Sequence, residues 1–190
     1  KRYTYWNRHL FRENRINVSL DEAKKNIETL LRESVNYSLQ TDKPLAVMLS
    51  GGIESCLVAK LAKDTGREVH TITAGYKGSH ACDERDVARR FAAEQGFIHH
   101  EIELDEQDFQ YCFEEFTQAM DEPITDSAAM AQWALFKKVK SLGFDVLLGG
   151  MGGDEMFFGY PYWNALGESY ALKQYHESLF PIRKNKKKYL

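Results

Sequence analysis

The sequence predicts an α/β protein with a parallel twisted sheet covered by helices on both faces. Short apolar runs with the character of buried strands alternate with longer segments whose apolar residues recur at helical spacing. Glycines follow several of the helical segments, as expected at helix C-termini. Strands that alternate with helices in this way form parallel sheets that are buried on both faces, which indicates this fold class.

The expected elements follow in chain order. Ser19 and Glu22 have the spacing of a capping box before a helical pattern that runs from Leu20 to Val35, and its apolar side is expected to pack on another part of the chain. Further helices are expected over about 55–66, 83–96, 109–120 and 127–141. Strands are expected over 45–49, 68–74, 98–104 and 144–148. In such a sheet, ligands bind outside the carboxyl ends of the strands, near a topological switch point.

The composition fits one packed domain in a reducing compartment. The 190 residues are 43% hydrophobic and 13% aromatic, which is enough for a buried core. A net charge of −3 gives no overall field that favours nucleic acid, so no nucleic-acid partner is expected. The three cysteines, Cys56, Cys82 and Cys112, form no Cys-x-x-Cys pair and leave an odd thiol. With no membrane-length apolar stretch and no signal-like N-terminus, we expect a cytoplasmic protein without a membrane partner.

The first glycine-rich segment, residues 50–55 with the sequence SGGIES, follows the strand expected at 45–49 and enters a helix. Backbone N–H groups at a helix N-terminus bind anions, and adjacent glycines let the backbone approach a phosphate closely. Glu54 offers a carboxylate to magnesium. The lysine of a Walker A loop is absent, so the phosphate is expected to be bound in a different way. The alternative is an ordinary strand-to-helix turn with a serine cap.

The second glycine-rich segment, residues 149–155 with the sequence GGMGGDE, follows the strand expected at 144–148. Four glycines within five positions cost much backbone entropy for a simple turn, and two carboxylates follow them at Asp154 and Glu155. A tight turn with Asp154 as a helix N-cap is the alternative. Together the two segments indicate a pocket for a nucleotide pyrophosphate and a magnesium ion.

These motifs carry a resemblance to a known family. The pattern at 49–55, the Asp-Glu-Pro run at 121–123 and the run at 149–160 have the order and spacing of class B asparagine synthetases. From about Tyr3 to Tyr160 the chain resembles their synthetase domain. The resemblance implies an adenine nucleotide alpha-hydrolase-like, Rossmann-like fold in which ATP activates a carboxylate as an acyl-adenylate with release of pyrophosphate. An amine then attacks the acyl-adenylate.

The resemblance also implies cofactors, partners and boundaries. ATP and Mg²⁺ are the expected cofactors, and a small-molecule carboxylate and an amine donor are the expected substrates. A glutaminase domain or partner chain is an expected partner, and a homo-oligomer is allowed. Residues 1–18 form an irregular N-terminal segment, 19–165 the ATP-binding synthetase domain, and 166–190 a tail that begins the helical acceptor-site region.

By the same resemblance, site residues are carried over one by one. The nucleotide is expected to contact Leu49, Ser50, Gly51, Gly52, Glu54, Ser55, Ala74, Gly75, Gly149 and Gly150. Glu54 and Asp154 are expected to hold the metal and to act in catalysis. The substrate-cleft candidates are Asp121, Asp126, Met151, Glu155 and Tyr160.

Three departures from the family pattern qualify this reading. Glu54 stands where the family ordinarily has aspartate, which moves the carboxylate outward by one methylene but keeps its charge. Met151 stands where asparagine synthetases have glutamate and lactam-forming relatives have tyrosine, and a thioether cannot transfer protons. The glutaminase domain and the region that supplies the family's adenylation lysine are not in this sequence, so we expect the chain to be incomplete on its own.

Two other functions stay open. One is a related amidotransferase, or a lactam or peptide cyclase, that makes a different amide. The other is a degenerate nucleotide-binding module that regulates or scaffolds a partner. Substrate-dependent release of AMP separates an enzyme from such a module. His99, His100 and Cys56 are expected to be structural, because the adjacent histidines of a strand point to opposite faces and a small residue beside a phosphate loop is usually buried.

Overall fold

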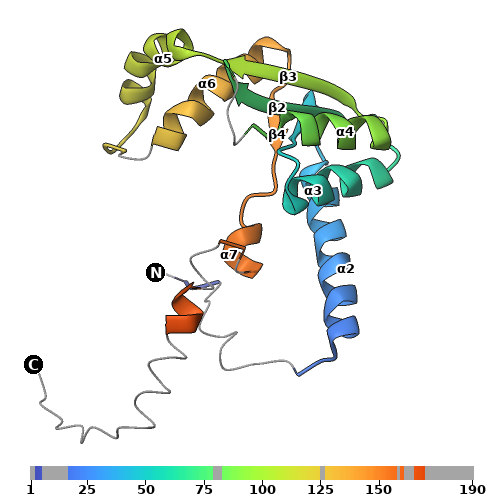
Figure 1. Ribbon diagram of the computed structural model, residues 1–190. Coiled ribbons are helices and arrows are strands. Elements are labelled where there is room, and N and C mark those ends of the chain that lie inside the picture. Colours follow the sequence, from blue (N-terminus) through green and yellow to red (C-terminus); the bar gives the residue numbers. More distant parts are fainter. Residues whose placement is uncertain are drawn as a thin grey trace, which may run out of the picture.

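The computed structural model describes residues 3–5, 17–78, 83–124, 127–157, 159–160 and 165–169. Within these residues, four parallel strands form one sheet in the order β3-β2-β1-β4 (Figure 1). The strands are β1 (Leu45–Met48), β2 (His70–Tyr76), β3 (Ile98–Leu104) and β4 (Val146–Leu148).

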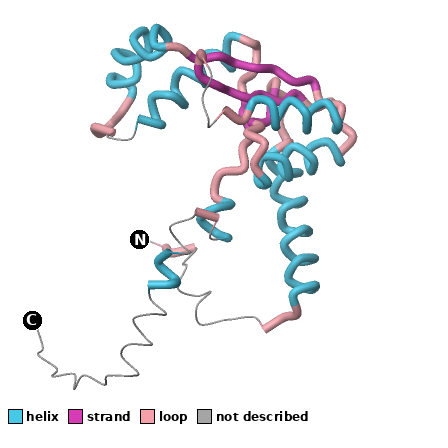
Figure 2. Tube along the Cα trace, viewed as in Figure 1, coloured by secondary structure: helices cyan, strands magenta, loops and turns pink. Residues whose placement is uncertain are grey.

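Helices connect the strands. They are α2 (Leu20–Ser38), α3 (Ile53–Asp64), α4 (Arg85–Gln95), α5 (Glu106–Ala119), α6 (Ser127–Ser141) and α7 (Gly153–Phe157). Figure 2 shows the strands gathered in one region, with the loop after β4 leading away from them to α7. None of the helices in the described part of the chain is both long and apolar enough to cross a bilayer.

Each face of the sheet has its own apolar core, because neighbouring side chains of a strand point to opposite faces. Val47 of β1 packs on one side with residues of α2, α3 and α4, including Val35, Ala59 and Ala88. Its neighbour Ala46 packs on the other side in a cluster that includes residues of α5 and α6. The sheet is therefore covered on both faces, and the fold class that the sequence predicts is confirmed.

The order of connections creates a switch point between β1 and β4. The chain leaves β1 through α3 to β2 and leaves β2 through α4 to β3, and both helices pack on one face. It then returns through α5 and α6 on the other face to β4, which pairs with the opposite edge of β1. The two glycine-rich segments follow β1 and β4, so both lie where ligands bind in folds of this class.

Several boundaries differ from the sequence expectation for local reasons. α3 begins at Ile53, with Gly52 as the N-cap, rather than at about residue 55. α5 begins at Glu106 rather than at 109, because Asp105 and Asp108 form a capping box made of two acids. The Asp105 side chain accepts the N–H of Asp108 at 3.1 Å, and the Asp108 side chain accepts the N–H of Asp105 at 2.9 Å.

Helix α2 contacts the rest of the protein mainly near its C-terminal end. Ser19 caps the helix, and its hydroxyl oxygen accepts the Glu22 N–H at 3.2 Å. Val35 and the C-cap residue Leu39 are buried, whereas Leu30 is 64% exposed. Figure 1 shows the N-terminal part of α2 projecting from the body of the molecule, which accounts for its exposed apolar side chains.

The two adjacent histidines of β3 point to opposite faces, as expected. His99 Nδ1 lies 2.9 Å from the Thr71 hydroxyl on one face. On the other face, His100 Nε2 lies 3.0 Å from His70 Nδ1, and the ring of Phe144 packs against both imidazoles. Burial, followed by the charge of His70, lowers the pKa of His100. The lowered pKa means that His100 favours its neutral form in the folded protein.

We expect acid to weaken the fold through this pair. A histidine whose folded pKa is lowered contributes stability above the ordinary pKa of about 6.5, and that stability is lost as the pH falls through the folded value. Urea denaturation of the wild-type protein and of His100→Gln, at neutral pH and about one unit below the ordinary pKa, measures the loss. The wild type should lose more stability on acidification than the variant, and equal losses would contradict this role for His100.

Candidate functional site

The loop after β1 is held by the hydroxyl groups of its two serines. The N–H of Ser50 donates to Ser55 Oγ at 3.1 Å, and the N–H of Gly52 donates to Ser50 Oγ at 3.2 Å. The Ser55 hydroxyl donates to the Gly52 carbonyl at 3.1 Å. The serine hydroxyls therefore shape the loop. The first backbone N–H groups of α3 have no acceptor within their helix and are free to bind an anion.

Gly51 allows this loop to contact α4. Its φ of +87° is a left-handed conformation that favours glycine. A Cβ atom here would lie 3.0 Å from Val87 Cγ1 and 3.4 Å from the backbone nitrogen of Ala88. The first turn of α4 therefore packs directly on the glycine loop, which leaves no room for a side chain.

The loop after β4 reaches the same place because Gly150 has no side chain. A Cβ atom at Gly150 would lie 2.8 Å from the carbonyl carbon of Glu54 and 2.9 Å from the backbone nitrogen of Ser55. These are main-chain atoms of the first turn of α3, so they cannot turn aside as a flexible side chain can. At the neighbouring Gly149, a Cβ atom would meet only Met48 Cε, at an ordinary 3.5 Å. Gly150 is thus the contact that joins the two loops.

Glu54 and Asp154 face one another where the loops meet. The Glu54 side chain passes over Gly153, where a Cβ atom would come within 2.3 Å of Glu54 Cγ. Removal from water, followed by the negative charges of Glu54 and Glu155 and a hydrogen bond with Glu54, raises the pKa of Asp154. A cation between the two carboxylates would relieve this repulsion.

A cavity of about 260 Å³ surrounds the carboxylate pair. The Tyr160 hydroxyl donates to Glu155 Oε1 at 2.5 Å in its wall, and this bond lowers the pKa of Glu155. Met151 is 78% exposed. The lining residues are Ser50, Glu54, Ser55, Gly150, Met151, Gly152, Asp154, Glu155 and Tyr160.

The carboxylate pair fits a magnesium ion. Mg²⁺ is usually held by one or two carboxylates together with water and the phosphate oxygens of a substrate, rather than by a complete protein cage. Within the described ranges, no group of three or more His, Cys, Asp or Glu side chains is arranged to hold a metal. A cation at Glu54 and Asp154 would therefore complete its coordination with ligand and water oxygens.

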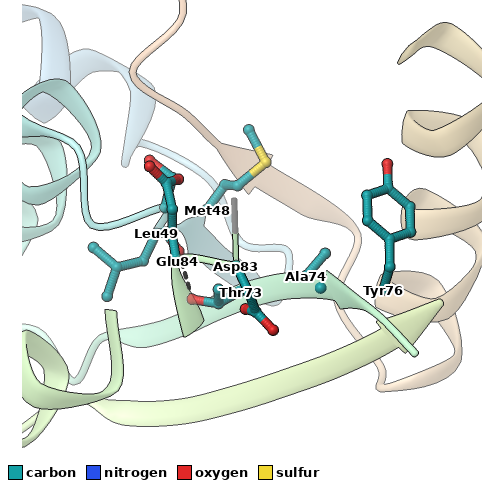
Figure 3. Close-up of a pocket in the computed structure, with 9 residues that line it drawn as sticks. Met48, Leu49, Thr73, Ala74, Tyr76, Asp83 and Glu84 are labelled. Carbon is teal, nitrogen blue, oxygen red and sulfur yellow. Dashed lines mark hydrogen bonds between the residues drawn. The ribbon is translucent and has the colours of Figure 1, made fainter. Parts of the chain in front are cut away.

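A second cavity, of about 160 Å³, opens between the ends of β1 and β2 (Figure 3). Met48, Leu49 and Ala74 give it largely apolar walls. The Thr73 hydroxyl donates to the Leu49 carbonyl, so this polar group is satisfied by the main chain. Ser50 lines both cavities, so the two cavities adjoin at the glycine loop.

The remaining wall of this second cavity comes from the start of α4. Asp83 and Glu84 line it there, as Figure 3 shows. Both carboxylate oxygens of Asp83 lie 2.9 Å from Arg85 Nε, which donates to them. Arg85 also donates to the Tyr76 carbonyl at 3.2 Å and lies over Gly75, where a Cβ atom would be 2.3 Å from Arg85 Nε. This arginine therefore ties the end of β2 to the start of α4.

The structure brings many of the predicted site residues into the two cavities. Leu49, Ser50, Ala74 and Gly75 line the second cavity, and the predicted metal ligands line the first. Gly51 and Gly52 lie in the loop after β1, and Gly149 begins the loop after β4. These three glycines line neither cavity. Asp121 is exposed in the connection between α5 and α6 and lines neither cavity. Asp126 lies outside the described residues.

Sequence reasoning missed five residues that line the second cavity. These are Met48, Thr73, Tyr76, Asp83 and Glu84. A signal for the two acids was present, because they open the helix that follows β2 and so stand at the carboxyl edge of the sheet. Cys56, next to the phosphate loop, has a raised thiol pKa because it is partly buried, which agrees with a structural role.

Comparisons with known proteins show the family. A family model described as asparagine synthase matches residues 26–188, which is most of the chain. The chain is 33% identical to asparagine synthetase [glutamine-hydrolyzing] 2 of Oryza sativa subsp. japonica over 164 residues, which cover 78% of this chain and 27% of that protein. The chain therefore belongs to the asparagine synthase family, and the resemblance seen in the sequence is confirmed.

Other relatives extend this picture. Asparagine synthetase [glutamine-hydrolyzing] 3 of Arabidopsis thaliana is 31% identical over 80% of this chain and 27% of its own length. Amidase chry2 of Gibberella zeae is 32% identical over 77% of this chain and 24% of its own length. The chain thus spans about a quarter of the curated relatives it matches. Among solved structures, it resembles the NH3-dependent NAD synthetase of Campylobacter jejuni, with a TM-score of 0.45 and 20% identity, over 75% of this chain and 61% of that one.

Gly150→Ala is expected to destabilise the protein, because its methyl group would overlap main-chain atoms of α3. Overpacking of this kind costs about 1–3 kcal/mol. Gly149→Ala is the matched control, since its methyl group makes only an ordinary contact. Urea denaturation of the two variants checks the prediction, and it is wrong if both lose the same stability.

Asp154→Asn is expected to stabilise the ligand-free protein at neutral pH. A carboxyl group whose folded pKa is raised contributes stability below its unfolded pKa of about 3.9, and this is lost as the pH rises through the folded value. Asparagine cannot ionise, so the variant does not lose this stability as the pH rises. It should also lose the stabilisation that bound magnesium gives the wild type. Asp42→Asn, at an exposed position away from both cavities, is the control. Urea denaturation at neutral pH, with chelator or millimolar Mg²⁺, tests both parts, and a wild-type magnesium response in Asp154→Asn would refute the metal assignment.

Proposed function

We propose that this chain is the nucleotide-binding part of an ATP-dependent, AMP-forming enzyme that makes an amide. One observation carries the proposal: Gly150 joins two glycine loops around the Glu54–Asp154 pair, beside a largely apolar cavity. A nucleotide needs hydrogen-bond donors for its phosphates, carboxylates for its cation and an apolar pocket for its base, and groups suited to these three roles are adjacent here. Membership of the asparagine synthase family supports ATP-dependent amide synthesis as the general class of reaction.

The loop after β1 would bind the phosphates. Its serine hydroxyls are used to hold the loop, so the donors to phosphate oxygens would be backbone N–H groups at the start of α3. Gly51 and Gly52 permit the close approach of the backbone to the ligand. The nucleoside would then enter the adjoining cavity between β1 and β2, where Ala74 and Gly75 lie.

Glu54 and Asp154 would hold a magnesium ion. When bound, the ion supplies positive charge that neutralises the leaving pyrophosphate. The chain itself would contribute by holding a carboxylate substrate in line with the α-phosphorus, since such positioning accounts for much of the rate of group transfer. Attack of the carboxylate oxygen on that phosphorus forms the acyl-adenylate and breaks the bond to pyrophosphate, which leaves with the electron pair.

The second step, attack by an amine, is where Met151 matters. The exposed thioether lies in the wall of the cavity that holds the carboxylate pair, and it can neither accept nor donate a proton. We therefore propose that the amine differs from the ammonia used in asparagine synthesis or meets another base. Where ammonia is used with another base, a glutaminase domain or a partner chain would supply it and complete the acceptor site, since the plant relatives are glutamine-hydrolysing and far longer.

A related enzyme with another substrate is the second candidate. The similarity to amidase chry2, which is named differently from the plant synthetases, supports it together with Met151. A degenerate nucleotide-binding module is the third candidate, and it requires binding without turnover.

Carboxylate-dependent exchange of labelled pyrophosphate into ATP tests the proposal, because it reports the first step without an amine. A panel of acids that includes aspartate should contain one that drives exchange. Mg-ATP at about 100 times its dissociation constant should add about 2.7 kcal/mol to the stability of the native state. Binding without exchange would favour the module, and no stabilisation by nucleotide or pyrophosphate would refute the site. Robust formation of asparagine from aspartate and ammonium would refute the inference from Met151.

A further inference from the structure

Glu84 is a charged group in the second cavity that the proposed function leaves unexplained. It is the N-cap residue of α4, yet its side chain makes no capping hydrogen bond. Within the described residues, no ion pair or side-chain hydrogen bond of Glu84 is found. Its neighbour Asp83 differs, because its carboxylate is neutralised by Arg85. Glu84 is an exposed residue, and it lines a cavity whose other walls are largely apolar.

The backbone of Glu84 is held by the first hydrogen bonds of α4. Its carbonyl accepts the N–H of Val87 at 3.1 Å and the N–H of Ala88 at 3.0 Å. Val87 in turn packs against Gly51 of the phosphate loop. Glu84 therefore lies one helical turn before a residue of α4 that contacts the loop that would hold the phosphates.

A carboxylate at this place selects its ligand by charge and hydrogen bonding. Like charges repel, so Glu84 is unsuited to a phosphate group. It is an acceptor only, and its two oxygens can accept hydrogen bonds from two hydroxyl groups. In a nucleotide, the ribose with its 2′ and 3′ hydroxyls directly follows the α-phosphate, whereas the base lies further away. In other dinucleotide-binding α/β folds, an acidic residue likewise accepts from a ribose hydroxyl.

We propose that Glu84 binds the ribose hydroxyls of the nucleotide and makes this site selective for ribonucleotides. The inference rests on the proposed binding of ATP and adds a residue that determines specificity. Apolar walls at Met48, Leu49 and Ala74 then remain for the base. Hydrogen bonds to a charged group are strong enough for the loss of one hydroxyl to weaken binding by about ten- to a hundred-fold.

Calorimetry tests the proposal. It measures how tightly the full chain binds Mg-ATP, its 2′-deoxy and 3′-deoxy analogues, and Mg-ITP. The wild type should bind ATP about ten- to a hundred-fold more tightly than the deoxy analogues. Glu84→Ala should weaken binding of ATP, which loses two hydrogen bonds, more than binding of each deoxy analogue, which loses one, and so bring the ratio close to one. Glu94→Ala, which removes an exposed carboxylate near the other end of α4, should keep the wild-type ratio.

The outcomes separate this inference from the proposed function. If the wild type binds ATP but does not distinguish the deoxy analogues, or if Glu84→Ala keeps the ratio, the role of Glu84 is refuted and nucleotide binding stands. If Glu84→Ala instead changes the ratio of the affinities for ATP and ITP, Glu84 contacts the base, and the ribose contact is refuted. No binding of ATP by the wild type would refute both. Glu84→Gln, which keeps the size of the side chain, replaces the alanine variant if melting curves show that the latter does not fold.

Discussion

The close packing of Gly150 on the first turn of α3 is the constraint on which the candidate site depends. It brings two loops from distant parts of the sequence together at main-chain distance. The pairing of β1 with β4 sets up this contact, since Val47 pairs with Leu148 and both loops begin just beyond these residues. Glu54 follows from one loop and Asp154 from the other, so their proximity is a product of sheet register.

This packing holds together two groups that repel each other. Glu54 and Asp154 are placed side by side by contacts of the backbone, and removal from water together with the charge of Glu54 raises the pKa of Asp154. In the function proposed here, a positive ion would meet two carboxylates already in place, so the site would not need to reorganise to bind it. Such preorganised electrostatics generally contribute more to catalysis than groups that must move into place.

The fold was largely predictable from sequence, and the site only in part. The bounds of β3 and α6 match the expected 98–104 and 127–141, because apolar periodicity and flanking turns mark them clearly. The start of α5 was missed because two acids cap it, where the apolar pattern gives no signal. Which glycine packs on α3 depends on register between β1 and β4, which no local pattern encodes. Glu84 escaped notice because it enters the cavity from a third part of the chain.

The contact between Glu54 and Gly153 means that the side chain at one position limits which side chain fits at the other. The extra methylene of Glu54, compared with the family's usual aspartate, lies where Gly153 has no side chain. A longer acid at position 54 and the lack of a side chain at position 153 are therefore sterically coupled. A redesign that shortens the acid could admit a small residue at 153, whereas either change alone would leave a gap or an overlap beside the metal ligands.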